Sequence, residues 1–128
     1  MNSYHILVIE DDELMQKVMH FILSKEGYTV TVKSNGKEGL EALQDVENKF
    51  DLIITDLMMP HANGFEILNV ARQTGNGGIP VIIVSNLSNE QMILDGFTMG
   101  ASDYVKKPIM AGELVLRVKR LLNSPKLV

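Results

Sequence analysis

Residues 51–60 read DLIITDLMMP, and this short stretch decides how the rest of the chain is interpreted. The apolar run Leu52–Ile54 continues through Thr55 and ends at the carboxylate of Asp56. A short apolar run rich in isoleucine is typical of a buried strand and is too short for a helix. A core strand that ends in a negative charge needs something nearby to neutralise that charge.

Further segments share this strand character, and helical patterns alternate with them. The other predicted strands are Tyr4–Ile9, Tyr28–Val32, Pro80–Val84 and Asp103–Lys106. Between them, apolar residues recur at steps of three and four, as in Leu14, Val18 and Ile22. Start and stop signals agree with these helices. Asn35 and Ser88 each precede an acid or amide by three residues, and Gly27 and Gly100 stand at helix ends.

The alternation predicts five βα units in an α/β fold. Strands that are apolar nearly throughout indicate a parallel sheet covered by helices on both faces. Right-handed crossovers then give a three-layer α/β sandwich. In such sheets ligands bind beyond the carboxyl ends of the strands, at the point where strand order switches.

Length, composition and charge restrict the function classes. The 128 residues suit a single domain, which we place at 1–123, with 124–128 as a tail or the start of a linker. The absence of cysteine excludes disulfides and thiolate metal sites. The net charge of −4 argues against direct nucleic-acid binding. With no membrane-length apolar run and no signal peptide, we expect a cytoplasmic protein that does not contact membranes.

Charged and polar residues stand where the predicted strands end. These residues are Glu10, Asp11, Asp12, Asp56, Ser85 and Lys107. A local role as helix cap and first-turn acid explains Asp12 and Glu13, but not the other acids. Because the carboxyl ends of parallel strands share one edge of the sheet, we expect the remaining side chains to converge there.

Carboxylates gathered at buried strand ends repel one another and raise each other's pKa. A cation relieves this repulsion, and an oxygen-only ligand set without histidine or cysteine favours Mg²⁺ over Zn²⁺. A Mg²⁺ site beside a spare carboxylate and a lysine suits phosphoryl transfer. The cations hold the phosphoryl oxygens while the carboxylate attacks in line.

At this point the chain resembles the receiver domains of two-component response regulators over essentially its whole length. The resemblance rests on ILVIEDD (6–12), DLIITDLMMPHANGFEIL (51–68), PVIIVSN (80–86) and GASDYVKKPI (100–109). It implies the flavodoxin-like strand order 2-1-3-4-5. It also implies a signalling module that promotes its own phosphorylation and dephosphorylation, rather than an enzyme with a separate substrate.

The resemblance implies roles for the acids. Asp56 is expected to accept a phosphoryl group from a phosphohistidine of a sensor histidine kinase or phosphotransfer protein. Asp11 is expected to bind Mg²⁺ directly and Glu10 through water, with the backbone carbonyl of Met58 as a further ligand. The apolar side chains of Met58 and Leu87 stand where the family orients hydrolytic water, which predicts a long-lived phosphoryl group.

The resemblance also implies a switch. Ser85 is expected to bind one phosphoryl oxygen and Lys107 another, with the bond from Lys107 to Pro108 in the cis form. Tyr104 stands where the family carries its switch aromatic. Movement of Ser85 toward the phosphoryl group lets Tyr104 turn inward. That remodels the face of the fourth helix, fifth strand and fifth helix, for an output domain or effector protein.

Interface residues and other function classes remain open at this stage. Asp103 and Arg117 fit one cross-subunit charge pair of the transcription-factor branch, whereas Ile93 stands where a base is expected. We therefore expect a monomer or a weak homodimer. Met92, Ile93 and Met99 form either an apolar docking surface or part of the core.

Three other function classes fit less well. An aspartate-nucleophile phosphatase needs a second aspartate two residues after the first, where this chain has Met58. A flavin carrier needs a small-residue phosphate loop after the first strand, where this chain has Glu10, Asp11 and Asp12. A binding-only module would not need the complete set of acids, serine and lysine.

Overall fold

The computed structural model describes residues 4–45, 47–57, 64–74, 78–86 and 90–122. Strands and helices alternate strictly along the chain. The strands are β1 His5–Ile9, β2 Thr29–Lys33, β3 Leu52–Thr55, β4 Val81–Ser85 and β5 Asp103–Lys106. The helices are α1 Glu13–Lys25, α2 Gly36–Gln44, α3 Gly64–Gln73, α4 Glu90–Thr98 and α5 Ala111–Leu122.

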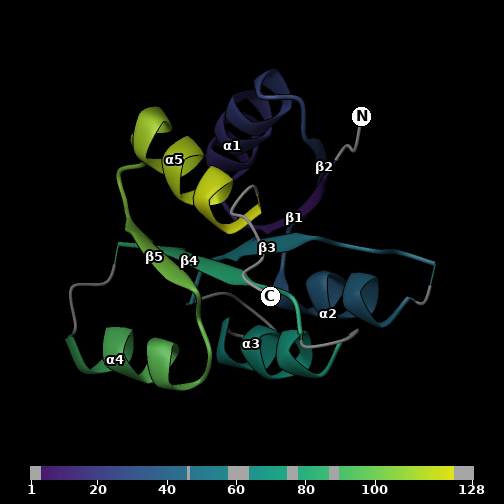
Figure 1. The fold of residues 1–128 in the computed structure, drawn as a ribbon, viewed down its shortest axis with the longest axis vertical. Helices are drawn as coiled ribbons and strands as arrows, with labels where there is room; N and C mark the ends of the chain where they lie inside the picture. The colour runs from purple at the N-terminus through teal and green to yellow at the C-terminus, as the bar shows by residue number, and fades with distance from the viewer. Residues whose placement is uncertain (1–3, 46, 58–63, 75–77, 87–89, 123–128) are drawn as a thin grey trace, which may run out of the picture.

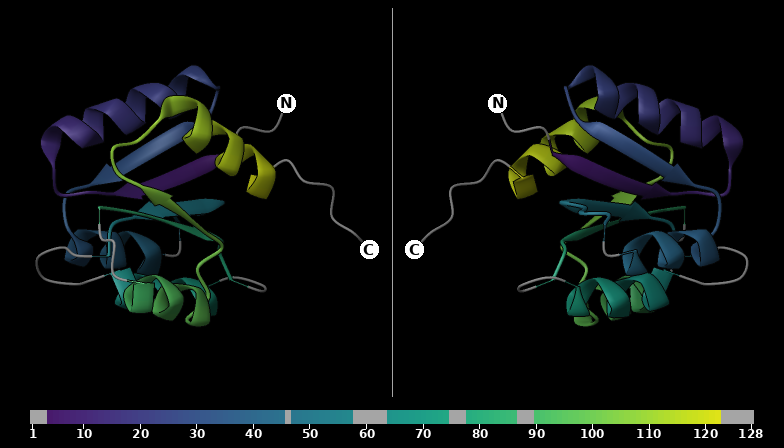
Figure 2. Two further views of the ribbon diagram at one scale, coloured as in Figure 1. Left: turned by 90° about the vertical axis from the view of Figure 1, so that its left-hand side faces the viewer. Right: turned by 90° about the vertical axis from the view of Figure 1, so that its right-hand side faces the viewer.

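The strands form one parallel five-stranded sheet in the order β2-β1-β3-β4-β5, as predicted. Helices α1 and α5 cover one face, and α2, α3 and α4 cover the other (Figure 1; Figure 2). Alternate residues of the strands feed two separate cores. Ile6 and Val8 pack with the α1 and α5 side, whereas Leu7 and Ile9 pack with the α2 and α3 side. The three-layer α/β sandwich is therefore confirmed.

Local signals place the helix ends. Asp12 caps α1 by accepting from the backbone amides of Leu14 and Met15. Asn35 caps α2 through the amide of Glu38, at 2.8 Å. The Glu38 side chain returns to the amide of Ser34 rather than to that of Asn35.

Two further helix-end predictions lie at a glycine and at a serine. Gly27, just after the end of α1, has φ +94°, a conformation that favours glycine. The cap predicted at Ser88 lies outside the described residues.

Candidate functional site

Glu10 directly follows β1 and is held from several sides. Its backbone amide donates to the carbonyl of Lys33 at 3.0 Å, which extends the ladder between β1 and β2. Its carboxylate oxygen Oε2 accepts from the amide of Asp12 at 3.0 Å. The residue is only 1% exposed. Burial raises the pKa of Glu10, and the neighbouring Lys107 ammonium only partly offsets this rise.

Lys107 follows β5 and bridges two carboxylates. Its Nζ lies 2.9 Å from Glu10 Oε1 and 3.0 Å from Asp56 Oδ2. Its backbone amide donates to the carbonyl of Ser85, and its peptide bond to Pro108 is cis, as predicted. Burial by itself lowers the pKa of Lys107, but the two carboxylates outweigh it and raise this pKa overall. The amine therefore stays charged between the acids.

Asp56 is fixed at the end of β3 and is 9% exposed. Its amide donates to the carbonyl of Ile9 at 3.4 Å, and its carbonyl accepts from the Thr55 hydroxyl at 3.1 Å. Gly64 packs against the same backbone. A Cβ atom at Gly64 would lie 2.8 Å from the Asp56 carbonyl oxygen and 2.9 Å from Leu57 Cα. The candidate nucleophile therefore sits on a backbone that has little room to shift.

One carboxylate oxygen from each of Glu10, Asp11 and Asp56 lies within 4.8 Å of the other two. Asp11 is exposed, whereas Glu10 is buried. Glu10 Oε1 has no hydrogen bond from any described residue, because Lys107 Nζ approaches it outside hydrogen-bond geometry. A buried carboxylate oxygen without a directed donor, within an oxygen-only set, fits a small hard cation such as Mg²⁺. The predicted Met58 ligand and the Leu87 side chain lie outside the described residues.

Ser85 and Tyr104 lie beside this cluster. Ser85 is fully buried and ends β4. Because β4 runs parallel to β3, Ser85 lies at the same edge of the sheet as Asp56. The Tyr104 hydroxyl donates to the backbone carbonyl of Ser85 at 3.4 Å. Burial raises the pKa of Tyr104; a hydrogen bond with the Ser85 side chain lowers it, and the negative charge of Asp56 raises it further. The two predicted switch residues are therefore in contact in this conformation.

Asp103 and Arg117 pair within one chain. Arg117 Nη1 lies 2.8 Å from Asp103 Oδ1 and 3.0 Å from Oδ2, and Arg120 Nη2 reaches Oδ2 at 3.1 Å. The hydrogen bonds to Asp103 raise the pKa of Arg117. A buried carboxylate thus binds two arginines of α5. The predicted role of this pair across a dimer stays a prediction.

The exposed apolar residues of α4 differ from those considered in the sequence. Met92, Ile93 and Met99 are half-buried, and Met99 packs against the core on the α2 and α3 side. The exposed ones are Leu94 at 51% and Phe97 at 44%. The alternative that the methionines belong to the core is therefore favoured for Met99.

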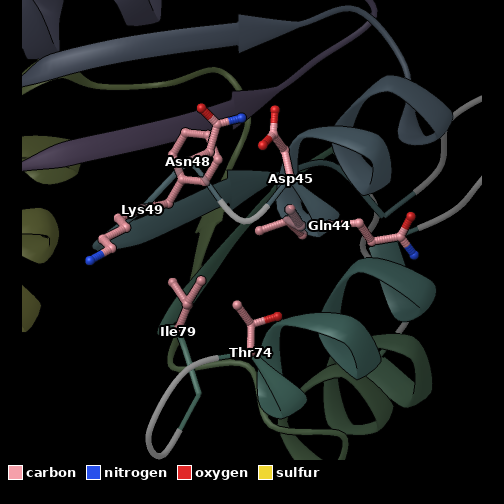
Figure 3. Close-up of a pocket in the computed structure, with 8 residues that line it drawn as sticks. Gln44, Asp45, Asn48, Lys49, Thr74 and Ile79 are labelled. Atoms are coloured by element: carbon pink, nitrogen blue, oxygen red, sulfur yellow. The ribbon is translucent and has the colours of Figure 1, made fainter.

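A cavity of about 440 Å³ lies at the opposite edge of the sheet (Figure 3). Phe50 and Ile79 in its wall precede β3 and β4, so it opens where these strands begin. Two polar side chains in its wall are bound locally: the Asn48 amide donates to the Ala42 carbonyl, and the Thr74 hydroxyl donates to the Val70 carbonyl. The cavity is therefore separate from the acidic cluster.

Sequence reasoning missed Gln16 of α1. Its side-chain amide donates to the backbone carbonyl of Glu10 at 2.7 Å. The available signal was weak. Gln16 lies one helical turn after the cap residue Asp12, and so on the same side of α1.

The sequence was compared with models of known protein families, and one family matches most of the chain. The family profile described as response regulator receiver domain matches residues 6–119. The chain belongs to this family. The receiver domain is thus a signalling component of a two-component system rather than an enzyme that turns over a separate substrate.

Relatives and solved structures extend the same finding. The chain is 38% identical over 124 residues to an uncharacterized transcriptional regulatory protein, YkoG, of Bacillus subtilis, covering 97% of this chain and 53% of that protein. It is 34% identical to response regulator SaeR of Staphylococcus aureus, covering 95% of this chain and 52% of SaeR. The receiver domain therefore spans about half the length of these curated relatives.

A solved structure agrees in both sequence and shape. The Francisella response regulator 1452 receiver domain is 32% identical, with a TM-score of 0.86, over 97% of this chain and all of that one. Among the described helices, none is both long and apolar enough to cross a bilayer.

Proposed function

We propose that Asp56 of this receiver domain accepts a phosphoryl group from a phosphohistidine of a partner kinase or phosphotransfer protein. One observation carries the proposal. The Lys107 ammonium lies 3.0 Å from Asp56 Oδ2, and the carboxylates of Glu10 and Asp11 stand around the same point. A nucleophilic carboxylate, a fixed cation and two further oxygen ligands are the parts that phosphoryl transfer to aspartate requires.

Each residue has a task in the proposed reaction. An Asp56 carboxylate oxygen forms the new P–O bond while the P–N bond to the donor imidazole breaks. Lys107 turns from the Asp56 carboxylate oxygen that it now contacts to a phosphoryl oxygen, and so neutralises charge on the transferred group. Glu10, Asp11 and Asp56 would hold Mg²⁺, which supplies further positive charge for the phosphoryl oxygens when bound.

The signal is proposed to leave through α4, β5 and α5. The acyl phosphate adds acceptor oxygens beside Ser85, whose hydroxyl binds one of them. Movement of Ser85 shifts the position of its backbone carbonyl, to which the Tyr104 hydroxyl now donates. Tyr104 lies on β5, so its reorientation alters the face that an output domain or effector reads. The change is a shift between two populated states.

A protein partner fits the surroundings of the site. Leu14 is 70% exposed in the first turn of α1, and Met110 is 68% exposed three residues after Lys107. Two large apolar side chains beside a charged site favour docking of a protein rather than of a small ion alone.

The proposed cellular setting follows from the family. We propose a cytoplasmic receiver domain at 1–123, with an output domain or effector as its partner, by analogy with the longer relatives. Residues 123–128 lie outside the described part of the chain.

Incubation with a small phosphodonor and Mg²⁺, followed by intact-protein mass spectrometry, tests the proposal. The wild-type chain should gain about 80 Da, the mass of one phosphoryl group. Asp56→Asn should abolish the adduct, whereas Asp51→Asn at the other end of the same strand should leave it intact. An adduct that persists in Asp56→Asn, or a wild-type chain that is never labelled, would overturn the assignment.

A further inference from the structure

We propose that Gln16 is a positioning residue that fixes the peptide between Glu10 and Asp11, and thereby sets the affinity of the acidic cluster for its divalent cation. The inference rests on the proposed function, in which Glu10, Asp11 and Asp56 hold that cation. It concerns a side chain outside the cluster, on the second turn of α1.

The Gln16 side-chain amide donates to the backbone carbonyl of Glu10, which lies just beyond the ladder between β1 and β2. The amide of Glu10 still pairs with β2, at the carbonyl of Lys33. In a regular parallel ladder the carbonyl of Glu10 would point to the same side and accept from the next amide beyond β2. The ladder between β1 and β2 ends at Lys33, however, and the chain turns into the Asn35 cap of α2. The Gln16 side chain supplies a donor at 2.7 Å instead.

Gln16 completes a closed set of contacts around the loop between β1 and α1. The backbone amide of Asp12 donates to Glu10 Oε2. The backbone amide of Gln16 donates to the backbone carbonyl of Asp12 at 2.9 Å. The Gln16 side chain then returns to Glu10. α1 packs closely on β2 and against α5, so it gives the side chain a rigid base (Figure 2). The loop that carries the acids is therefore tied at both ends.

The tether acts chiefly on Asp11. The Glu10 carboxylate is already fixed by the Asp12 amide and by the charge of Lys107, whatever Gln16 does. Asp11 is exposed, so its direction depends on its backbone. The peptide plane from Glu10 to Asp11 sets that backbone, and the bond from Gln16 holds the carbonyl of this plane. Loss of the bond lets Asp11 turn away from the other two acids.

The size of the effect follows from comparable metal sites. Removing a residue that orients a metal ligand typically lowers metal affinity by about 10–100-fold. Here the tether orients one of three side chains, so we expect the low end, about 10-fold. At saturating cation the cluster is filled in either protein. The rate of phosphoryl transfer at saturating Mg²⁺ should therefore change by less than about twofold.

Two Gln16 variants and one control make the test. Gln16→Leu keeps the size but removes the donor, and Gln16→Asn keeps the amide but shortens its reach. Gln44→Leu makes the same change at an exposed glutamine of α2. Affinity for Mn²⁺ or Mg²⁺ alone is measured by calorimetry without phosphodonor. The Mg²⁺ concentration for half-maximal labelling of Asp56 is measured by mass.

Both Gln16 variants should need about 10-fold more cation in both assays, with Gln44→Leu unchanged. If the wild type binds no cation, the proposed function itself fails. If the wild type binds and Gln16→Asn, with a wild-type thermal midpoint, binds equally well, only the positioning role is wrong. A lowered maximal rate at saturating Mg²⁺ with unchanged affinity also overturns that role.

Discussion

Replacing Lys107 with methionine removes the cation that joins two buried carboxylates. The Lys107 side chain is 18% exposed, and those of Glu10 and Asp56 are 1% and 11% exposed. Methionine keeps most of the apolar stem of lysine, so the substitution removes the charge with little loss of packing. In the presence of a chelator, the two acids then lose the cation that lay between them.

The contact distances and the exposure set the magnitude. At 2.9 and 3.0 Å and an effective dielectric of about 20, each attraction is worth about 5–6 kcal/mol before other terms. Desolvation and the repulsion between the carboxylates offset much of this attraction. Removing one partner of a buried pair costs about 3–5 kcal/mol, and the partial exposure of Lys107 points to the lower value, about 3 kcal/mol. For a domain of this size, that lowers the thermal midpoint by about 10 °C.

The deficit should also depend on pH. Burial already raises the pKa of Glu10 above its usual 4.5, and Lys107→Met removes the interaction that lowers it. The folded variant therefore binds more protons than the unfolded chain between pH 4.5 and the raised value. Its stability falls as pH rises through that window. The loss relative to the wild type is largest above the window and shrinks on acidification.

Chemical denaturation at several pH values, in chelator, measures this loss. Lys106→Met is the matched control, because Lys106 is the exposed neighbour of Lys107 on β5. It should change the free energy of unfolding by less than about 0.5 kcal/mol. A Lys107→Met chain as stable as the wild type at neutral pH would refute the reasoning, as would a deficit that grows on acidification.

Three further perturbations test other parts of the domain. Gly64→Ala forces a methyl group onto the backbone at Asp56 and should cost about 1–3 kcal/mol and slow its labelling. Gly112→Ala, with open space around its Cβ, serves as control, and equal thermal midpoints for the two would contradict the expected clash. Asp103→Ala leaves two α5 arginines without their carboxylate. It should cost about 1–2 kcal/mol in denaturant titrations, since both arginines can rehydrate; an unchanged midpoint speaks against this. Mg²⁺ affinity should decline on acidification before pH 4.5 is reached, because protons compete for Glu10. Calorimetry showing constant affinity down to pH 4.5 would oppose that claim.

The sequence predicted the fold closely because the inner strands β1, β3 and β4 are buried on both faces. Such strands read as unbroken apolar runs, and β3 was predicted with its observed bounds. The remaining strands differ by no more than one residue at an end; β1 begins at His5 rather than Tyr4. The cap at Asp12 was also predictable, because a side-chain cap needs only local spacing.

Contacts between distant segments were only partly predictable. The fold placed Glu10, Asp56 and Lys107 at one edge, but no local rule says that Lys107 reaches both acids at once. The second arginine on Asp103, Arg120, was missed because its selection depends on how α5 lies across β5. Such pairings are set by packing rather than by spacing along the chain.

The sequence left the phase of α4 open, because Met92, Ile93 and Met99 suited either a docking surface or the core. Gly96 is the one buried residue of α4, so no stripe of buried apolar side chains marks the inner face of this helix. Periodicity then cannot tell which of its apolar side chains face solvent. In the structure Leu94 and Phe97 are exposed, whereas Met92 and Ile93 are half-buried.

The strand order has a mechanical consequence for the domain. β1, β3 and β4 each have strands on both sides, whereas β5 is paired along one side only, to β4. Shifting an inner strand disturbs two ladders, but shifting β5 disturbs one. Tyr104 therefore stands on the more compliant border of the sheet, while Asp56 stands at its stiff centre. In the proposed function, phosphorylation of Asp56 at the centre of the sheet can therefore displace β5 at its border without loosening β3, the strand that leads to the proposed acceptor.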